Sequence, residues 1–195
     1  MKRAFDFVVA LFGLVVLAPF LLLAMCAIRL ESPGPAIFAQ KRVGRGGGTF
    51  TFYKLRSMRS DTAEQPTHLA GAAVLTRLGP FLRRSKLDEL PQLWNVVRGD
   101  MSLVGPRPCL PSQIALIEAR RREGALSVKP GMTGLAQVQK IDMSDPIGLA
   151  RVDGAYARGQ SFRGDLRLLA LTLGGAGLGF DAARPDDGHA APKDR

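Results

Sequence analysis

The chain has 195 residues, of which 46% are hydrophobic and 23% are charged, and its formal net charge is +10. This composition excludes a disordered chain, a collagen-like fibre and a disulfide-rich scaffold. So basic a protein is expected to bind anionic partners such as nucleic acid, phosphorylated metabolites or an acidic membrane surface. Its cysteines, Cys26 and Cys109, suggest no disulfide framework, and its histidines, His68 and His189, suggest no zinc site.

An uncharged stretch runs from Phe7 to Ile28. As a straight helix it would measure about 33 Å, enough to cross a membrane. Pro19 lies near its middle and basic residues flank both ends, so the positive-inside rule does not favour crossing. We therefore predict a helix over residues 1–30 that breaks at Ala18-Pro19 and returns to the same face as a re-entrant hairpin. A kinked full span and a signal peptide are the alternatives.

A β-hairpin is predicted next. Ala36–Val43 and Thr49–Lys54 are rich in aromatic and β-branched residues, and Gly44–Gly48 lies between them. The glycine run does not match a Walker motif and does not open a helix, so a hairpin turn is favoured over a phosphate cradle. The small and polar stretch Ser60–Ala73 suggests a mobile loop.

Helical spacing predicts helices over Leu75–Leu82, Leu90–Arg98 and Gln113–Glu123. Val128–Val138 contains glycines and a proline, which indicates a turn followed by a strand or an extended loop. The apolar stretch Leu166–Phe180 is too short between charges to span a membrane, so we expect a helix lying in the membrane interface. An ordinary core helix is the alternative there.

The adjacent acids Asp88 and Glu89 are the first candidates for chemistry. Ser85, three residues before Asp88, can cap a helix start, and Pro91 delays a regular helix until near Leu90. The helix dipole and nearby cations would favour an ionised Asp88, which could coordinate Mg²⁺ or attack phosphorus. Neighbours on a helix point about 100° apart, so the two acids should have different roles. A capping residue beside a surface acid is the simpler alternative.

Arg107 is the second candidate, because Pro106 and Pro108 bracket it. The prolines fix the local backbone, so the guanidinium is presented at low entropic cost, which suits phosphate binding. Most other basic residues are accounted for by a solvated face lying on anionic headgroups.

The sequence resembles the bacterial sugar transferase family, in particular its small monotopic phosphoglycosyl transferases, over residues 2–173. The motifs that carry the resemblance occur in the family's order: Lys2–Asp6, Phe52–Met58, Leu87–Gln92, Gly99–Ser102, Val104–Pro108 and Lys129–Gly134. The chain departs from the family at Ala18, where many relatives have serine, and at Leu135 and Gln139–Ile141, where many have tryptophan and Asn-Gly-Arg. The identity of the sugar therefore cannot be inferred.

The resemblance implies transfer of a sugar 1-phosphate from a UDP-sugar to polyprenol (undecaprenyl) phosphate, with Mg²⁺ and release of UMP. Such a reaction begins glycoconjugate assembly, as in exopolysaccharide, O-antigen or glycoprotein glycan synthesis. By motif position Asp88 would be the nucleophile, forming an aspartyl-phosphosugar intermediate, and also a metal ligand. Glu89 would assist through the metal or the acceptor. Lys54, Arg83 and Arg107 would contact the diphosphate, the nucleotide or the acceptor phosphate.

The expected fold class is α+β and mostly helical. It is that of a monotopic membrane protein with an N-terminal re-entrant helix hairpin, a small β-hairpin and interfacial amphipathic helices. We expect a re-entrant helix over residues 1–30, a cytoplasmic-face catalytic domain over residues 31–180 and a disordered tail over residues 181–195. The expected location is the bacterial inner membrane, in contact with anionic lipid. We expect no nucleic-acid partner, and a homodimer is left open.

Two other functions remain as alternatives. A glycosyl transferase acting on the same lipid would release UDP instead of UMP. A membrane-tethered basic protein would bind nucleic acid or acidic lipid without nucleotide chemistry.

Overall fold

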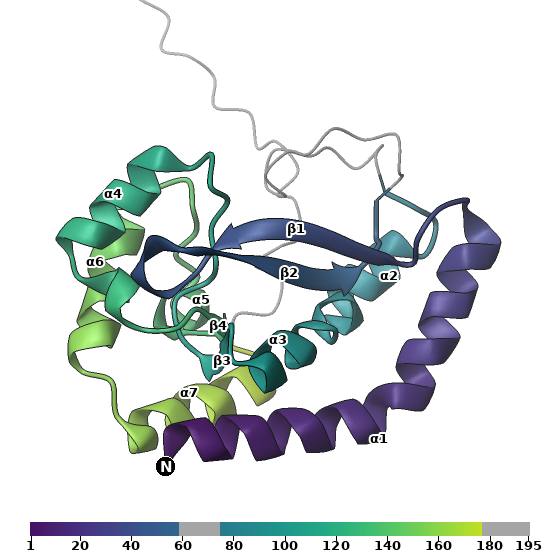
Figure 1. The fold of residues 1–195 in the computed structure, drawn as a ribbon, viewed down its shortest axis with the longest axis horizontal. Coiled ribbons are helices and arrows are strands. Elements are labelled where there is room, and N and C mark those ends of the chain that lie inside the picture. Colours follow the sequence, from purple (N-terminus) through teal and green to yellow (C-terminus); the bar gives the residue numbers. More distant parts are fainter. Residues whose placement is uncertain (59–74, 177–195) are drawn as a thin grey trace, which may run out of the picture.

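The computed structural model describes residues 1–58 and 75–176, and within them the fold is α+β and mostly helical, as predicted (Figure 1). The predicted loop Ser60–Ala73 and tail 181–195 lie outside the described residues. The α-helices are α1 (Lys2–Glu31), α2 (Gly79–Arg84), α3 (Gln92–Arg98), α4 (Ile114–Arg122), α5 (Leu135–Val138), α6 (Pro146–Arg158) and α7 (Phe162–Leu173). The strands and short 3₁₀ helices are β1 (Ile37–Val43), η1 (Arg45–Gly47), β2 (Thr49–Leu55), η4 (Leu87–Glu89), β3 (Ser102–Val104), η5 (Ala125–Ser127) and β4 (Gly131–Thr133).

Helix α1 is 30 residues long and apolar enough to cross a membrane. Only 6% of its most apolar stretch is buried in the fold, so its side chains form a large exposed apolar surface. The predicted break at Ala18-Pro19 is wrong in form: helical structure continues through Pro19, and the axis bends part-way along (Figure 1). Proline removes one backbone donor and crowds the preceding turn, which bends a helix without necessarily ending it. The two halves of α1 do not lie against each other.

Both ends of α1 are attached to the rest of the fold. At the amino end, Lys2 Nζ lies 2.6 Å from Asp165 Oδ2 on α7, and Arg3 donates to carbonyls of the last turn of α3. At the carboxyl end, Arg56 donates to the carbonyls of Ser32 and Pro33 at 2.7 and 2.8 Å. The Arg3 bonds satisfy carbonyls at the carboxyl end of α3, and the Arg56 bonds hold the chain just beyond α1, so α1 is fixed at two separate points.

The predicted hairpin is confirmed. Strands β1 and β2 pair antiparallel, with Ile37 opposite Leu55 and Val43 opposite Thr49. The turn between them includes Gly46 and Gly47 at φ of 72° and 85°. Side chains other than glycine rarely adopt this left-handed backbone, which explains the glycine run as turn chemistry.

Strands β3 and β4 form a second, parallel pair, with Ser102 opposite Gly131 and Val104 opposite Thr133. The predicted turn and strand within Val128–Val138 are therefore confirmed, although the last four residues form α5 instead of extended chain. The two strands bring the Val104–Pro108 and Lys129–Gly134 segments side by side.

Two of the three predicted central helices are confirmed, since α3 and α4 lie within Leu90–Arg98 and Gln113–Glu123. The prediction for Leu75–Leu82 is wrong at its start. Leu75 pairs with Met58 in an isolated β-bridge, and helix α2 begins only at Gly79. At Gly79 the backbone lies so close to that of Ser57 that a Cβ on Gly79 would be 2.3 Å from the Ser57 carbonyl oxygen.

Helix α6 was not predicted, although it starts in a recognisable way. The Asp145 side chain accepts a hydrogen bond from the Gly148 amide at 2.9 Å, and a proline occupies the first helical position. A buried ion pair joins α6 to α4, because Arg120 Nη2 lies 2.7 Å from Asp153 Oδ2 and both side chains are 3% exposed.

Helix α7 begins four residues earlier than the predicted Leu166–Phe180, because Ser161 caps it by accepting from the Gly164 amide at 3.2 Å. Asp165 and Leu168 are buried, whereas Leu166 and Leu171 are 40% and 41% exposed. The helix therefore packs on the core with one side and leaves an apolar side uncovered. The first half of α1 runs beside it, where the rings of Phe5 and Phe162 meet edge-on at 5.2 Å (Figure 1).

Candidate active site

The segment between α2 and α3 positions the two candidate acids. Ser85 Oγ donates back to the carbonyls of Phe81 and Leu82 at 2.8 and 3.2 Å, so it closes α2 and does not cap a helix at Asp88. The predicted cap is therefore wrong. Lys86 then turns the chain with a φ of 58°, and the short helix η4 presents Asp88 and Glu89 in different directions.

Asp88 points into the fold and is 7% exposed. Burial and the neighbouring Glu89 raise the pKa of Asp88 from its ordinary value of 3.8 to about 6, against the opposing effect of Lys54, Arg83 and Lys86. The cations act in the predicted direction, but the loss of hydration outweighs them. At pH 7 about nine-tenths of this carboxyl is still ionised. Its Oδ1 atom is buried and has no hydrogen-bond partner among residues 1–58 and 75–176.

Lys54 and Arg83 provide the positive charge beside Asp88. Burial lowers the pKa of Lys54 from 10.5 to about 8, while attraction to Asp88 opposes that change. Its Nζ also lies 5.2 Å from the centre of the Phe38 ring. Arg83 Nε donates to Ser57 Oγ at 3.1 Å, which holds the guanidinium near the end of β2. The sequence motifs of β2, α2 and η4 therefore meet around one buried carboxylate.

Glu89 faces a different partner. Its Oε1 lies 2.8 Å from Nη2 of Arg107, and both side chains are only partly buried. The two acids thus occupy different surroundings, as predicted from their adjacent positions. Ala18 and Pro19, the remaining residues singled out in the sequence, belong to α1 and not to this cluster.

The backbone that carries Arg107 is held tightly. Pro106 and Pro108 are buried while Arg107 between them is partly exposed. A Cβ on Gly131 would lie 2.0 Å from the amide nitrogen of Gly105, so these two glycines permit the contact of the adjacent backbones. The guanidinium is therefore presented by a rigid loop, which supports the sequence argument about the flanking prolines.

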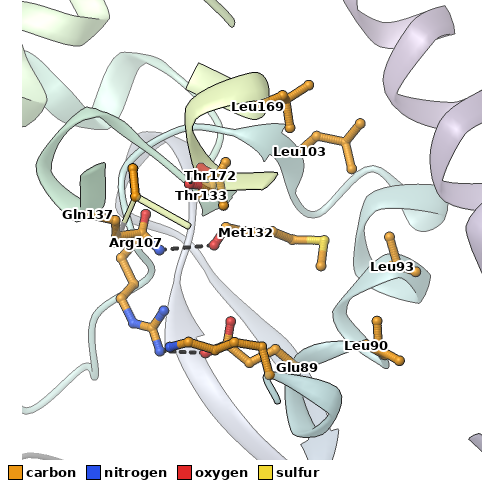
Figure 2. A pocket seen from close by; sticks show the side chains of 12 residues that line it. Glu89, Leu90, Leu93, Leu103, Arg107, Met132, Thr133, Gln137, Leu169 and Thr172 are labelled. Atoms are coloured by element: carbon orange, nitrogen blue, oxygen red, sulfur yellow. Dashed lines mark hydrogen bonds and ion pairs between the residues drawn. The ribbon is translucent and has the colours of Figure 1, made fainter. Parts of the chain in front are cut away.

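Beside Glu89 and Arg107 lies a pocket of about 250 Å³ (Figure 2). Most of its wall is apolar, and the ion pair of Glu89 with Arg107 lies at one end. Gln137 is fixed near Arg107, since its Nε2 donates to the Met132 carbonyl at 2.9 Å. Thr133 and Thr172 bond to each other across the wall at 2.7 Å. Such a pocket suits a ligand that is apolar over most of its length and anionic at one end.

The described residues are compatible with Mg²⁺ at Asp88. Its buried, unpartnered Oδ1 is a hard oxygen ligand of the type that this ion prefers. Within the described ranges there is no group of three or more His, Cys, Asp or Glu side chains able to hold a metal ion by themselves. Mg²⁺ commonly takes one or two carboxylates and completes its shell with water and substrate phosphates, so this donor set fits that ion.

Two structural residues near the site were not singled out from the sequence. Arg56 is 5% exposed and binds the carboxyl end of α1, as described above. Asn95 is fully buried on α3, where its amide donates to the Thr51 carbonyl at 2.7 Å and its oxygen accepts from the Tyr53 amide at 3.2 Å. A polar side chain among apolar residues in a predicted helix is the signal that could have identified Asn95.

A buried carboxylate facing cations, in a fold that carries a long exposed apolar helix, is compatible with a membrane-associated site for phosphate chemistry. The chain belongs to the bacterial sugar transferase family, whose model matches residues 1–176. The chain is thus a member of a family of membrane-associated transferases, as the sequence motifs predict.

Two of the similar proteins that follow are named as sugar phosphotransferases that act on undecaprenyl phosphate. The chain is 49% identical over 181 residues to the UDP-glucose:undecaprenyl-phosphate glucose-1-phosphate transferase of Caulobacter vibrioides, covering 88% of this chain and 68% of that protein. It is 38% identical to the uncharacterized sugar transferase EpsL of Bacillus subtilis, covering 89% of this chain and 85% of that protein. It is also 38% identical to the undecaprenyl-phosphate glucose phosphotransferase of Komagataeibacter xylinus, but spans only 35% of that longer protein.

Proposed function

We propose that the protein transfers a sugar 1-phosphate from a UDP-sugar to polyprenyl phosphate through a covalent intermediate on Asp88, and releases UMP. The observation that carries this proposal is the buried Asp88 carboxylate, with its open Oδ1 atom and the cations Lys54 and Arg83 beside it. The names of the relatives support the two substrate classes.

In the first half-reaction, an oxygen of the Asp88 carboxylate attacks the phosphorus that carries the sugar. The new bond joins Asp88 to that phosphorus, and the bond to the bridging oxygen of the diphosphate breaks. UMP leaves with the electron pair of the broken bond. Lys54 and Arg83 stabilise the charge that gathers on the leaving phosphate, so catalysis depends on positioning and electrostatics.

The second half-reaction reverses the roles. An oxygen of the acceptor phosphate attacks the same phosphorus, the bond to Asp88 breaks, and the carboxylate is restored. No proton transfer to carbon or oxygen is needed, because both attacking groups are already anionic. Mg²⁺ held by Asp88 and substrate phosphates would neutralise the diphosphate charge. Glu89 positions Arg107 through their 2.8 Å ion pair.

We also propose that α1 is a re-entrant membrane helix on the cytoplasmic face of the inner membrane, and the attachment of both its ends supports the re-entrant geometry. A helix that spans a bilayer has its two ends on opposite sides, about 30 Å of hydrocarbon apart. Here Lys2 and Ser32, at the two ends of α1, are both bound by the same folded domain. The exposed apolar side of α7 would then lie in the interface beside α1.

Nucleotide release tests the chemistry. With Mg²⁺, polyprenyl phosphate and a panel of UDP-sugars, the purified protein is expected to release UMP with at least one sugar. Asp88→Asn should abolish both UMP release and the phosphosugar adduct, because an amide is a poor nucleophile. The variant protein should still remain in the membrane fraction. UDP as the product would instead indicate glycosyl transfer. An active, adduct-forming Asp88→Asn protein would exclude the proposed nucleophile.

Labelling tests the topology. In a Cys26→Ser background, single cysteines at Ala4 and Leu30 should react with an impermeant maleimide from the same side of sealed vesicles. Both positions are exposed, whereas the remaining Cys109 is fully buried. Labelling of the two positions from opposite sides would show that α1 spans the membrane.

A further inference from the structure

The pocket beside Glu89 and Arg107 has two chemically distinct parts (Figure 2). Its apolar wall combines side chains from four parts of the fold. They are Leu93 on α3 with Leu90 just before that helix, Leu103 on β3, Met132 on β4 and Leu169 on α7. The Met132 side chain extends across the space toward Leu93 (Figure 2). Leucine and methionine side chains bind a hydrocarbon ligand favourably, because apolar surface is removed from water on both sides. They provide few hydrogen bonds for a nucleotide or a free sugar.

The other part of the pocket is polar. Arg107 presents a guanidinium there, held by Glu89 at 2.8 Å, and Lys86 also lines the pocket. Guanidinium groups bind phosphate oxygens with two parallel hydrogen bonds. The Oε1 atom of Gln137 is buried with no hydrogen-bond partner in the described part of the chain, so it is open to a donor on a bound ligand.

The apolar part adjoins the elements with exposed apolar surfaces. Leu93 packs against the first half of α1, where a Cβ on Gly13 would lie 3.3 Å from its Cδ1. Leu169 is on α7, whose Leu166 and Leu173 are exposed. If these surfaces lie in lipid, a chain dissolved in the bilayer reaches the apolar wall without crossing water.

We infer that this pocket holds the phosphate-proximal isoprene units of the lipid acceptor along Leu93, Met132 and Leu169, with the acceptor phosphate at Arg107. The inference rests on the proposed function and adds the place where the second substrate binds. At about 250 Å³ the pocket is smaller than the roughly 300–1,000 Å³ that encloses a drug-sized ligand, so it holds only the start of a long chain. The rest of the chain remains in the bilayer.

Variants that fill the pocket test the inference. Leu169→Phe and Met132→Phe narrow it from two different elements, and Leu166→Phe places the same residue on the exposed side of α7 as the matched control. The assay uses farnesyl phosphate as acceptor and, separately, measures the adduct formed with the UDP-sugar alone. Thermal unfolding of each variant checks that the fold is retained.

The two filling variants are expected to raise the KM for farnesyl phosphate by roughly tenfold relative to the control, as displacement of about two buried methylene groups would. The rate of adduct formation should stay within about twofold of the control, since adduct formation needs no acceptor. An unchanged KM in both variants would overturn the inference. A parallel loss of adduct formation would also overturn it, because the pocket would then serve the nucleotide sugar.

A binding measurement separates this inference from the proposed function. Equilibrium dialysis of the wild-type protein with farnesyl phosphate, using methyl phosphate as competitor, needs no transfer chemistry. If no adduct forms with any UDP-sugar, the proposed function fails. Binding of farnesyl phosphate that methyl phosphate does not displace, and that Leu169→Phe weakens, would still support the pocket. Equal binding by Leu169→Phe and by the Leu166→Phe control would refute it.

Discussion

Replacing the buried carboxylate should stabilise the protein while removing its activity. Asp88 is 7% exposed, and its pKa lies at about 6 in the folded protein against 3.8 when hydrated. Folding therefore disfavours the ionised form of this carboxyl. At about 1.36 kcal/mol per pKa unit, the free energy of unfolding at pH 7 is lower by about 3 kcal/mol than it would be with a neutral group there.

The sign of the pH dependence follows from the direction of the shift. Below pH 3.8 the carboxyl is protonated in both the folded and the unfolded state, so its charge costs nothing. As the pH rises from there through about 6, the unfolded state loses its proton first, and the folded state loses relative stability. Asp88→Asn removes this cost, so its advantage over the wild type should grow across that window and level off above it.

Thermal unfolding in detergent micelles at pH 4, 5, 6 and 7.5 measures the effect. For a chain of this size about 3 kcal/mol corresponds to a rise in Tm of about 6–12 °C at the highest pH, as an upper value. Comparing variant with wild type at each pH cancels the titration of all other groups. Glu118→Gln is the control: it neutralises an exposed carboxylate on α4, so it should change the Tm by no more than about 2 °C. A Tm for Asp88→Asn that is lower than wild type at pH 7.5, or a difference independent of pH, would refute the reasoning.

Two further predictions follow from the same geometry. Lys54→Met removes a cation that lowers the pKa of Asp88, so the acid limb of kcat/KM, expected near pH 6, should move up by about one unit. Lys41→Met, on the exposed side of the hairpin, is the control, and a shift toward lower pH would contradict the assignment. Gly131→Ala should destabilise the protein by about 1–3 kcal/mol, because its Cβ would lie 2.0 Å from the Gly105 amide. Gly48→Ala, whose added Cβ would lie 4.0 Å from the Arg45 carbonyl oxygen, should leave the midpoint of chemical denaturation unchanged.

Local signals in the sequence were sufficient for the elements that depend on local chemistry. The glycine run of the hairpin, the spacing of α3 and α4 and the prolines around Arg107 each have a physical meaning within a few residues. The different surroundings of Asp88 and Glu89 also agree with their adjacent positions. The motif order then identified the family, although no single motif would have done so.

Tertiary contacts decided the features that sequence reasoning missed. Ser85 bonds back to α2, and no local pattern distinguishes this from a cap of the next helix. The raised pKa of Asp88 could not be predicted from neighbouring cations, because it depends on burial beneath β2. The attachment of both ends of α1 to one domain depends on residues distant in sequence, such as Arg56 and Asp165.

The polar contacts at the two ends of α1 also bear on the site itself. Asp165 accepts from Lys2 at 2.6 Å and from the Tyr156 hydroxyl at 2.7 Å, and the oxygen of that hydroxyl also lies 3.0 Å from the Val104 carbonyl oxygen. Val104 ends β3 and directly precedes the loop that carries Arg107. At the other end, Arg56 binds the carboxyl end of α1. The next residue in the chain, Ser57, is the hydrogen-bond partner of Arg83. The apolar helix is therefore bound next to both backbone segments that hold Arg107 and Arg83, so the same contacts fix the position of α1 and the geometry of the site.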